Sequence, residues 1–153
     1  MLVGLISDTH GKFDPKIPEL FRDVEHILHA GDICGNEIIL KLEQIALTTA
    51  VLGNNDYDPQ YRELEIVELA ANKILINHIV PFHNPHAPIF DNIRRVKPDI
   101  VLYGHTHKPA DETKDGIRYL NPGYAGPQRF KLRRTVALMD LAATPAKVEF
   151  HDL

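Results

Sequence analysis

Apolar runs of strand length alternate with segments of helical spacing through the first third of the chain. Leu2–Ser7 is a short apolar run that leads into a polar loop, which is typical of a buried strand. Asn36–Gln44 has apolar residues at 38, 39, 40 and 42, a spacing that predicts a partly buried helix. We expect strands at Leu2–Ser7, His26–Ala30 and Ile45–Leu52, and helices at Pro18–Val24 and Asn36–Gln44.

The rest of the chain is richer in strands. Two apolar runs flank Ala70-Ala71-Asn72 and indicate a hairpin, whereas Pro81–Pro88 holds three prolines and is expected to be a loop. We expect strands at Glu65–Leu69, Lys73–Asn77, Asp99–Tyr103, Gly116–Leu120, Arg134–Leu141 and Lys147–Phe150, the last three antiparallel, and a helix at Ile89–Val96. Strand and helix alternation followed by a β-rich tail predicts an α/β protein with mixed sheets.

Length and composition bound this picture. The 153 residues favour a single domain over 1–153, and 44% hydrophobic with 25% charged residues is ordinary for a soluble globular protein. With 17 Lys and Arg against 21 Asp and Glu, the net charge is −4. That balance gives no basic footprint, so we expect neither nucleic acid nor an anionic membrane as a partner.

Targeting and redox signals are few. No apolar run approaches the ~18 residues of a membrane span, and the apolar start has no basic flank and reaches Asp8 at once. The single cysteine, Cys34, excludes an intramolecular disulfide framework, and we expect it to be a small buried residue. These features favour a cytoplasmic protein.

Polar residues gather where the expected strands end. Their successive spacings of 24, 22, 24 and 27 residues each match one strand–helix or hairpin unit. Because ligand sites in open α/β sheets lie beyond the carboxyl ends of the strands, we expect these side chains to meet in one crevice. They are Asp8, His10, Asp32, Asn54, His78, His105 and His107.

Two carboxylates, one amide and four imidazoles exceed the four ligands of a closed structural zinc site. They suit two divalent ions if a carboxylate bridges them, and the donor types fit Mn, Fe, Co, Ni or Zn. Two carboxylates against two dications leave about +2, which attracts phosphate. Paired metals ~3.5–4 Å apart stabilise in-line displacement at phosphorus. Phosphate ester hydrolysis is therefore the hypothesis that the ligand chemistry favours.

Five sequence blocks in this order resemble the calcineurin-like metallophosphoesterase family, and within it the small single-domain phosphodiesterases, a group that also contains the retromer scaffold subunit. The blocks are Asp8-Thr9-His10, Gly31-Asp32, Gly53-Asn54-Asn55-Asp56, His78 and Gly104-His105-Thr106-His107, and Asn121-Pro122-Gly123 resembles a turn of the small members. The resemblance implies a four-layer α/β/β/α sandwich with two mixed sheets inside and helices outside.

The resemblance also implies roles for these residues. Asp32 would bridge two metals, and a hydroxide between the metals would attack phosphorus. Asn54 would also contact a phosphate oxygen. The first metal would be held by Asp8, His10 and His107 and the second by Asn54, His78 and His105, and the candidate catalytic residues are Asp32, Asn54, Asn55 and Asp56.

Two positions depart from the family pattern. Many members have His where this chain has Asn55, and an amide cannot act as a general acid near neutral pH. We therefore expect diesters with activated leaving groups to be better substrates than alkyl monoesters. Members often read His-Gly-His where this chain has His78-Ile79-Val80, and His83 or His86 in the following loop is our candidate to replace the missing substrate contact.

The sequence thus predicts a manganese-type, dinuclear phosphodiesterase with a small phosphodiester substrate. The alternatives are a non-catalytic scaffold on the same fold and a module that senses phosphate or nucleotides without turnover. Self-association into a homo-oligomer stays open. Tyr57, Tyr61 and Tyr124 are candidates for lining a pocket, and we interpret the basic run from Arg129 to Arg134 as a solvated strand edge.

Overall fold

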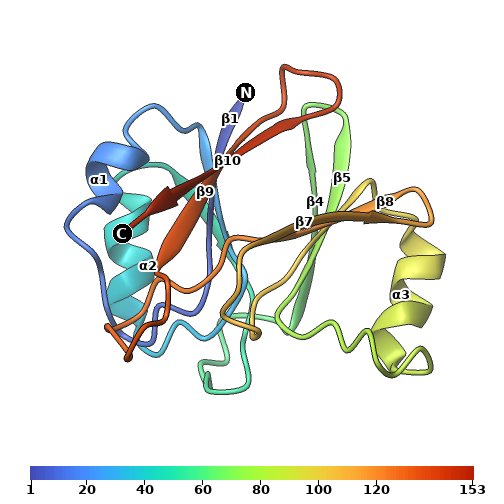
Figure 1. The fold of residues 1–153 in the computed structure, drawn as a ribbon, viewed down its shortest axis with the longest axis horizontal. Helices are drawn as coiled ribbons and strands as arrows, with labels where there is room; N and C mark the ends of the chain where they lie inside the picture. Colours follow the sequence, from blue (N-terminus) through green and yellow to red (C-terminus); the bar gives the residue numbers. More distant parts are fainter.

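Two five-stranded β-sheets form the centre of the molecule, which a computed structural model describes over residues 1–153 (Figure 1). The strands are β1 (Leu2–Ile6), β2 (His26–His29), β3 (Leu47–Ala50), β4 (Leu64–Leu69), β5 (Asn72–Asn77), β6 (Ile100–Leu102), β7 (Ala110–Lys114), β8 (Ile117–Asn121), β9 (Thr135–Asp140) and β10 (Lys147–Asp152). The helices are α1 (Ile17–Leu20), α2 (Asn36–Glu43) and α3 (Pro88–Val96).

Both sheets are mixed, as the sequence predicts. The first has the order β10-β9-β1-β2-β3, in which β1, β2 and β3 are parallel and β9 runs antiparallel to β1. The second has the order β4-β5-β6-β8-β7, in which β5, β6 and β8 are parallel and both edge strands are antiparallel to their neighbours. The parallel strands therefore end together, and their following loops lie at one edge of each sheet.

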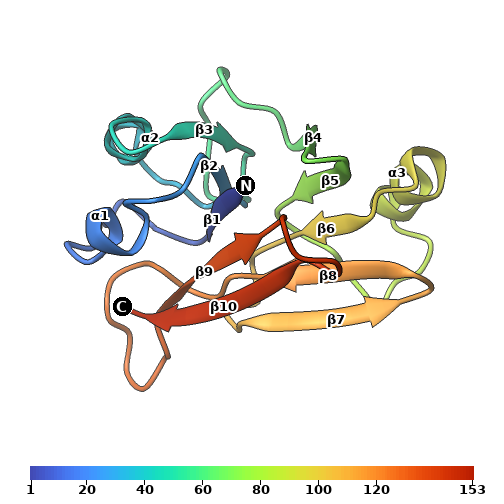
Figure 2. The ribbon, with the colours of Figure 1, turned by 90° about the horizontal axis from the view of Figure 1, so that it is seen from above.

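The molecule has four layers, which confirms the expected α/β/β/α sandwich. Helices α1 and α2 cover the outer face of the first sheet, and α3 covers the outer face of the second (Figures 1 and 2). Alternation along the strands fills the layers, because successive side chains point to opposite faces. Ile74 and Ile76 pack with Val3 and Leu5 between the sheets, while Leu75 packs under α3.

Two sequence predictions about elements are wrong. The run that forms β8 does not join β9 and β10 but lies in the second sheet, parallel to β6. Of the three strands expected to be antiparallel to one another, β9 and β10 alone form such a pair. The other neighbour of β8 is β7, which no sequence pattern predicts, because Asp111–Lys114 is exposed and carries no apolar alternation. Helix α1 also ends at Leu20 rather than at Val24.

No helix of the molecule has both the length and the apolar character needed to cross a membrane.

Candidate metal centre

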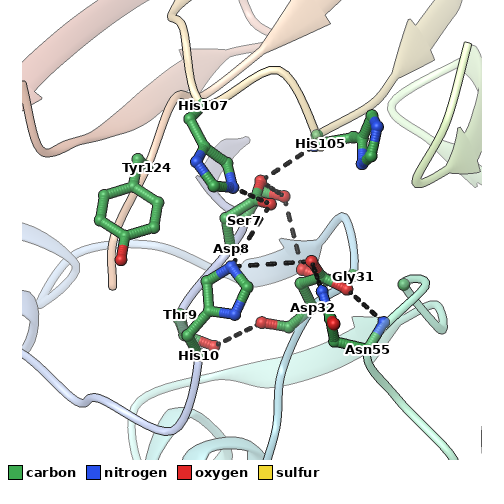
Figure 3. Close-up of polar contacts among 12 residues, drawn as sticks. Ser7, Asp8, Thr9, His10, Gly31, Asp32, Asn55, His105, His107 and Tyr124 are labelled. Carbon is green, nitrogen blue, oxygen red and sulfur yellow. Dashed lines mark hydrogen bonds and ion pairs between the residues drawn. The ribbon is translucent and has the colours of Figure 1, made fainter. Parts of the chain in front are cut away.

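The seven predicted ligands follow the ends of five strands: β1, β2, β3, β5 and β6. Figure 3 shows the side chains of Asp8, His10, Asp32 and His107 turned toward a common space. The first sheet and the second sheet both contribute, so the centre lies where the two sheets meet. The parallel topology that the sequence predicts is what brings these loops together.

Asp8 is fully buried, and its two oxygens have different surroundings. Oδ2 accepts hydrogen bonds from Ser7 Oγ at 2.6 Å and from the backbone N–H of His105 at 3.1 Å. Oδ1 accepts none and lies 3.1 Å from Nε2 of His107. The carboxylate is therefore anchored by one oxygen and presents the other to the cluster.

Asn55 holds the second carboxylate, that of Asp32. The backbone N–H of Asn55 donates to Oδ1 at 2.9 Å and its Nδ2 donates to Oδ2 at 2.7 Å. Oδ2 also lies 3.6 Å from His10 Nε2 and 3.4 Å from His78 Nε2, between the two imidazoles. Burial alone would raise the pKa of Asp32, but the adjacent His78 imidazole and the hydrogen bonds from Asn55 outweigh it and hold that pKa well below its usual value.

A hydrogen bond on the side of the ring away from the carboxylates fixes the orientation of His78. Its Nδ1 lies 2.7 Å from the carbonyl oxygen of Ala30, and only a protonated Nδ1 can donate to a carbonyl. In the neutral ring the lone pair of Nε2 is then directed at the two carboxylates, as in imidazole ligands of metals. Burial lowers the pKa of His78, but the nearby carboxylates of Asp32 and Asp8 outweigh it and raise the pKa overall.

Three buried polar atoms in this cluster have no hydrogen-bond partner: Asp8 Oδ1, His10 Nε2 and His78 Nε2. Such atoms are rare in folded proteins, because an unpaired buried polar group is costly. Lone pairs of like polarity facing one another are stable only with a cation or proton between them. Donor atoms within 4.8 Å of one another form two groups that share Asp8, one with His10 and His107 and one with Asp32 and His78. The residues present therefore fit divalent metal ions.

The two remaining predicted ligands lie at the open side of the cluster. Nδ1 of His105 is 3.0 Å from Oδ1 of Asn54, and both residues are exposed. The His105 ring centroid lies 5.4 Å from that of His78, which connects this pair to the buried donors. His83 and His86 are exposed on the loop before α3, and no polar contact joins either of them to the cluster, so their contact with substrate stays a prediction.

The backbone at the centre is unusual. Positive φ is uncommon for residues other than glycine and concentrates at functional sites. Eleven non-glycine residues have positive φ here, and five of them are predicted ligands. These are Asp8 (55°), His10 (45°), Asp32 (54°), His105 (65°) and His107 (59°). Gly104 shows how close the loops approach, because a Cβ there would lie 2.0 Å from Ser7 Oγ.

Asp56, a predicted catalytic residue, has its carboxylate turned to backbone amides. Oδ2 accepts from Ile33 at 3.0 Å and from Gly53 at 2.8 Å, and Oδ1 accepts from Cys34 at 2.7 Å. The side chain thus ties the loop after β2 to the loop after β3. These hydrogen bonds hold together the loops that carry Asp32 and Asn55, and a catalytic role for Asp56 stays a prediction.

His29 connects the two loops that carry Asp8, His10 and Asp32. Its Nδ1 accepts from Gly31 N–H at 3.2 Å, so its Nε2 carries the proton and donates to Thr9 Oγ1 at 3.0 Å. Thr9 Oγ1 in turn donates to the carbonyl of Ile33 at 3.1 Å. Burial lowers the pKa of His29 to about 4, which keeps this imidazole neutral at physiological pH.

Tyr124, a predicted pocket-lining candidate, adjoins the cluster, and the exposed Arg129 of the basic run lies next to it. The buried Tyr124 ring lies 4.6 Å from the His107 ring and 5.8 Å from the His10 ring, measured between ring centroids, so it packs against one side of both imidazoles. The Arg129 guanidinium lies 5.7 Å from the same tyrosine ring. Their signal was the Asn121-Pro122-Gly123 turn, which immediately precedes Tyr124.

Two expectations for single residues are wrong. Cys34 is exposed rather than buried, with Sγ 3.7 Å from His10 Nδ1. The thiol is still partly desolvated, and this together with nearby Asp56 raises its pKa to about 11. Arg134 does not lie on a solvated edge: it is buried and donates to Asp14 Oδ2 at 2.7 Å. Both outcomes depend on how distant loops pack, which the local sequence does not contain.

The fold and donor set define a two-sheet α/β sandwich with a candidate divalent-metal centre at its strand ends. The model of the calcineurin-like phosphoesterase superfamily domain matches residues 1–144. The chain belongs to this family. The family and the donor geometry together indicate divalent metal binding.

Curated relatives support the same assignment. The chain is 35% identical over 146 residues to a probable metallophosphoesterase of Methanocaldococcus jannaschii, covering 90% of this chain and 75% of the relative. It is 30% identical over 138 residues to a phosphodiesterase of the same organism, covering 80% and 83%.

Solved structures share the complete fold. An archaeal phosphodiesterase superposes with a TM-score of 0.79 at 25% identity, over 100% of both chains. A Vps29 variant of Entamoeba histolytica superposes with a TM-score of 0.74 at 26% identity, over 100% of this chain and 99% of the other. The wild-type Vps29 of that organism, solved with Zn²⁺, shows the same fold with a TM-score of 0.75 at 24% identity, over 99% of both chains.

Proposed function

We propose that this single domain is a dinuclear, metal-dependent phosphodiesterase. The observation that carries the proposal is the convergence of unpartnered, buried donor atoms from Asp8, His10 and His78. Asp32 would bridge the two ions, because its Oδ2 lies between His10 and His78. The first ion would be held by Asp8, His10 and His107, and the second by Asn54, His78 and His105.

The residues of this chain would prepare the site for an anionic ester. Ser7 and Asn55 fix the two carboxylates, and the Ala30 carbonyl fixes the His78 ring, so the donor atoms need no reorganisation to bind. Bound divalent ions would supply a nucleophile at neutral pH and neutralise the charge that develops on the phosphoryl oxygens. Two carboxylates leave about two positive charges of the ions uncompensated, which attracts an anionic phosphate ester.

Asn55 would set the preference among leaving groups. Its amide is engaged with Asp32 and cannot protonate a departing alkoxide. Leaving groups that are stable as anions, such as nitrophenolate, should depart without that help. We therefore infer a preference for activated diesters over alkyl monoesters, with Mn²⁺ as the first ion to test.

Hydrolysis of bis(p-nitrophenyl) phosphate tests the proposal. The protein is stripped with a chelator, Mn²⁺ is added back, and bound metal and turnover are measured for wild type and Asp32→Asn. We expect two ions per chain and turnover restored in wild type, with at least a hundredfold loss in the variant. Asp91→Asn, an exposed carboxylate on α3, is the matched control and should behave as wild type.

The predicted contact of His83 or His86 with substrate needs a separate measurement. The double variant His83→Ala/His86→Ala should raise KM for the same diester while the bound metal content stays unchanged. Unaltered KM and kcat would remove both residues from the substrate site.

The likeness to Vps29 structures favours one second candidate, a non-catalytic scaffold that keeps the fold and its metal. Two bound ions without turnover on any phosphodiester would support this candidate or the phosphate-sensing module over the hydrolase.

A further inference from the structure

A hollow in the surface lies beside the candidate metal centre. Its volume is about 500 Å³, within the range of sites for small organic ligands. It lies between the loop after β2 and the loop after β3, which projects at the bottom of Figure 1. Apolar and aromatic side chains form much of its wall, namely Ile33, Leu52, Tyr57, Pro59 and Tyr61.

Asn55 connects this hollow to the centre. It lines the hollow, and its two N–H groups hold the oxygens of Asp32 at 2.9 and 2.7 Å. Cys34 lines the hollow too, with its Sγ 3.7 Å from His10 Nδ1. A phosphodiester held at the centre can therefore direct one of its two ester substituents into the hollow.

The charge of the wall decides what that substituent can be. None of the eleven lining residues is Lys, Arg or His, and Asp56 and Asp58 are both present. A second phosphate group would meet only negative charge there. The occupant is therefore not anionic, and any hydrogen-bond donors that it carries would meet acceptors in the wall.

The aromatic and polar groups of the wall narrow the choice further. Tyr57 lines the hollow and is 89% exposed, so much of its apolar ring surface is in contact with water. A ring stacked on Tyr57 would bury this surface on binding, which is favourable. The Tyr61 hydroxyl donates to Asn36 Oδ1 at 2.9 Å, so the amide hydrogens of Asn36 stay free to donate. Asp58 offers an acceptor oxygen, since its Oδ1 alone is engaged by the N–H of Gln60. An aromatic ring for stacking, together with one hydrogen-bond donor and one acceptor, suits a flat heterocycle whose edge carries both an acceptor and a donor.

We infer that this hollow binds the base of a nucleoside, so that the substrate is a nucleoside phosphodiester with its phosphorus at the metal centre. The inference rests on the proposed phosphodiesterase function and specifies its substrate class. Tyr57 is the stacking residue, and Asn36 with Asp58 reads the polar edge of the base.

A pair of substrates isolates the base. Thymidine 5′-(p-nitrophenyl phosphate) and methyl p-nitrophenyl phosphate share the leaving group and the charge and differ only in the other substituent. With the Mn²⁺-loaded protein, kcat/KM for the thymidine ester should be at least tenfold higher, through a lower KM. Tyr57→Ala should reduce this ratio to about twofold, while Tyr57→Phe, which keeps the ring, should retain it. Leu47→Ala, an exposed apolar side chain elsewhere, is the control and should keep the wild-type ratio.

A binding measurement separates this inference from the hydrolase proposal. Thymidine and adenosine are titrated into chelator-treated wild type and Tyr57→Ala by calorimetry, without catalysis. Binding of a nucleoside that weakens at least tenfold in Tyr57→Ala supports the base site even if no ester is hydrolysed. Turnover of both esters at equal kcat/KM overturns the base site and leaves the hydrolase intact. Absence of both binding and turnover overturns the two together.

Discussion

At the scale of single residues, the proposed preference among leaving groups depends on Asn55. Its side chain donates to Asp32 Oδ2, and the sequence resemblance implies a histidine at this position in many members of the family. Asn55→His should introduce a proton donor there, and general acids typically contribute 10²–10⁴-fold. We expect phenyl phosphate, whose leaving group needs protonation, to gain at least tenfold in kcat/KM. Bis(p-nitrophenyl) phosphate should gain little, because nitrophenolate departs unaided.

Steady-state kinetics with both esters checks this prediction, and Asn84→His on an exposed loop is the matched control. An equal gain for both esters, or none for phenyl phosphate, would contradict the role given to Asn55.

His29 makes the stability of the fold depend on pH. Its pKa falls from 6.5 in the unfolded chain to about 4 in the buried site. Between these values the unfolded chain binds a proton that the folded chain does not, so acid favours unfolding. The contribution is fully present above pH 6.5 and is lost as the pH falls toward 4. It amounts to about 2 kcal/mol between pH 7.5 and pH 5.

Urea unfolding at both pH values, in chelator so that metal binding does not contribute, measures this loss. His29→Gln should be less stable at pH 7.5, because the hydrogen bonds to Gly31 and Thr9 are altered, but should lose about 2 kcal/mol less on acidification. The same dependence on pH in variant and wild type would assign the acid sensitivity to other groups.

At the scale of elements, the β4–β5 hairpin is closed by a strained turn. Ala70 and Ala71 both have positive φ, of 46° and 63°, in a two-residue connection that favours Asn-Gly. Left-handed backbone costs about 1–2 kcal/mol per residue other than glycine. Ala70→Asn/Ala71→Gly should therefore raise the free energy of unfolding by about 1 kcal/mol, measured by urea denaturation. Ala142→Gly, where φ is not positive, should give no increase.

The elements that the sequence predicted are those whose apolar pattern is local. Strands β1, β2 and β5 are apolar runs buried on both sides, and α3 begins at Pro88, a strong start signal. Strand β7 has the sequence Ala-Asp-Glu-Thr-Lys and forms only because the edge of β8 is available to pair with it. No local pattern marks such a strand.

The candidate site also has one part that the sequence predicted and one part that it did not. Ligand types at strand ends were readable, because the parallel topology places those ends together. Two residues that orient the ligands were not readable, because Ser7 acts through one hydroxyl and Ala30 through one carbonyl, whereas Tyr124 was only a general candidate for lining a pocket. The contacts of Ser7 and Ala30 span up to 48 positions in the chain, and nothing in the identity of these two residues marks them.

At the scale of the whole molecule, the candidate ligands come from both sheets. Asp8 and Asp32 follow strands of the first sheet, and His78 and His107 follow strands of the second. If the two sheets separated, the ligands would no longer lie together and metal would not bind. Bound metal should therefore stabilise the entire fold against unfolding. At a hundred times Kd, binding adds about 2.7 kcal/mol, which raises Tm by roughly 5–10 °C for a domain of this size.

Circular dichroism melts in Mn²⁺ and in chelator measure this shift. Asp32→Asn should lose most of it, whereas Asp91→Asn on α3 should keep it in full. An unchanged Tm in wild type at saturating Mn²⁺ would contradict a site shared by the two sheets.

The position of β9 also has a consequence for biosynthesis. In the first sheet β9 lies between β10 and β1, with Ala137 opposite Leu5. A ribosome makes β1 first and β9 near the end, so one hydrogen-bonding edge of β1 stays open through most of translation. The first sheet can close only after residues 135–140 have emerged. A chain cut before Thr135 would leave that edge exposed, so a stalled nascent chain should be a chaperone substrate rather than a folded fragment.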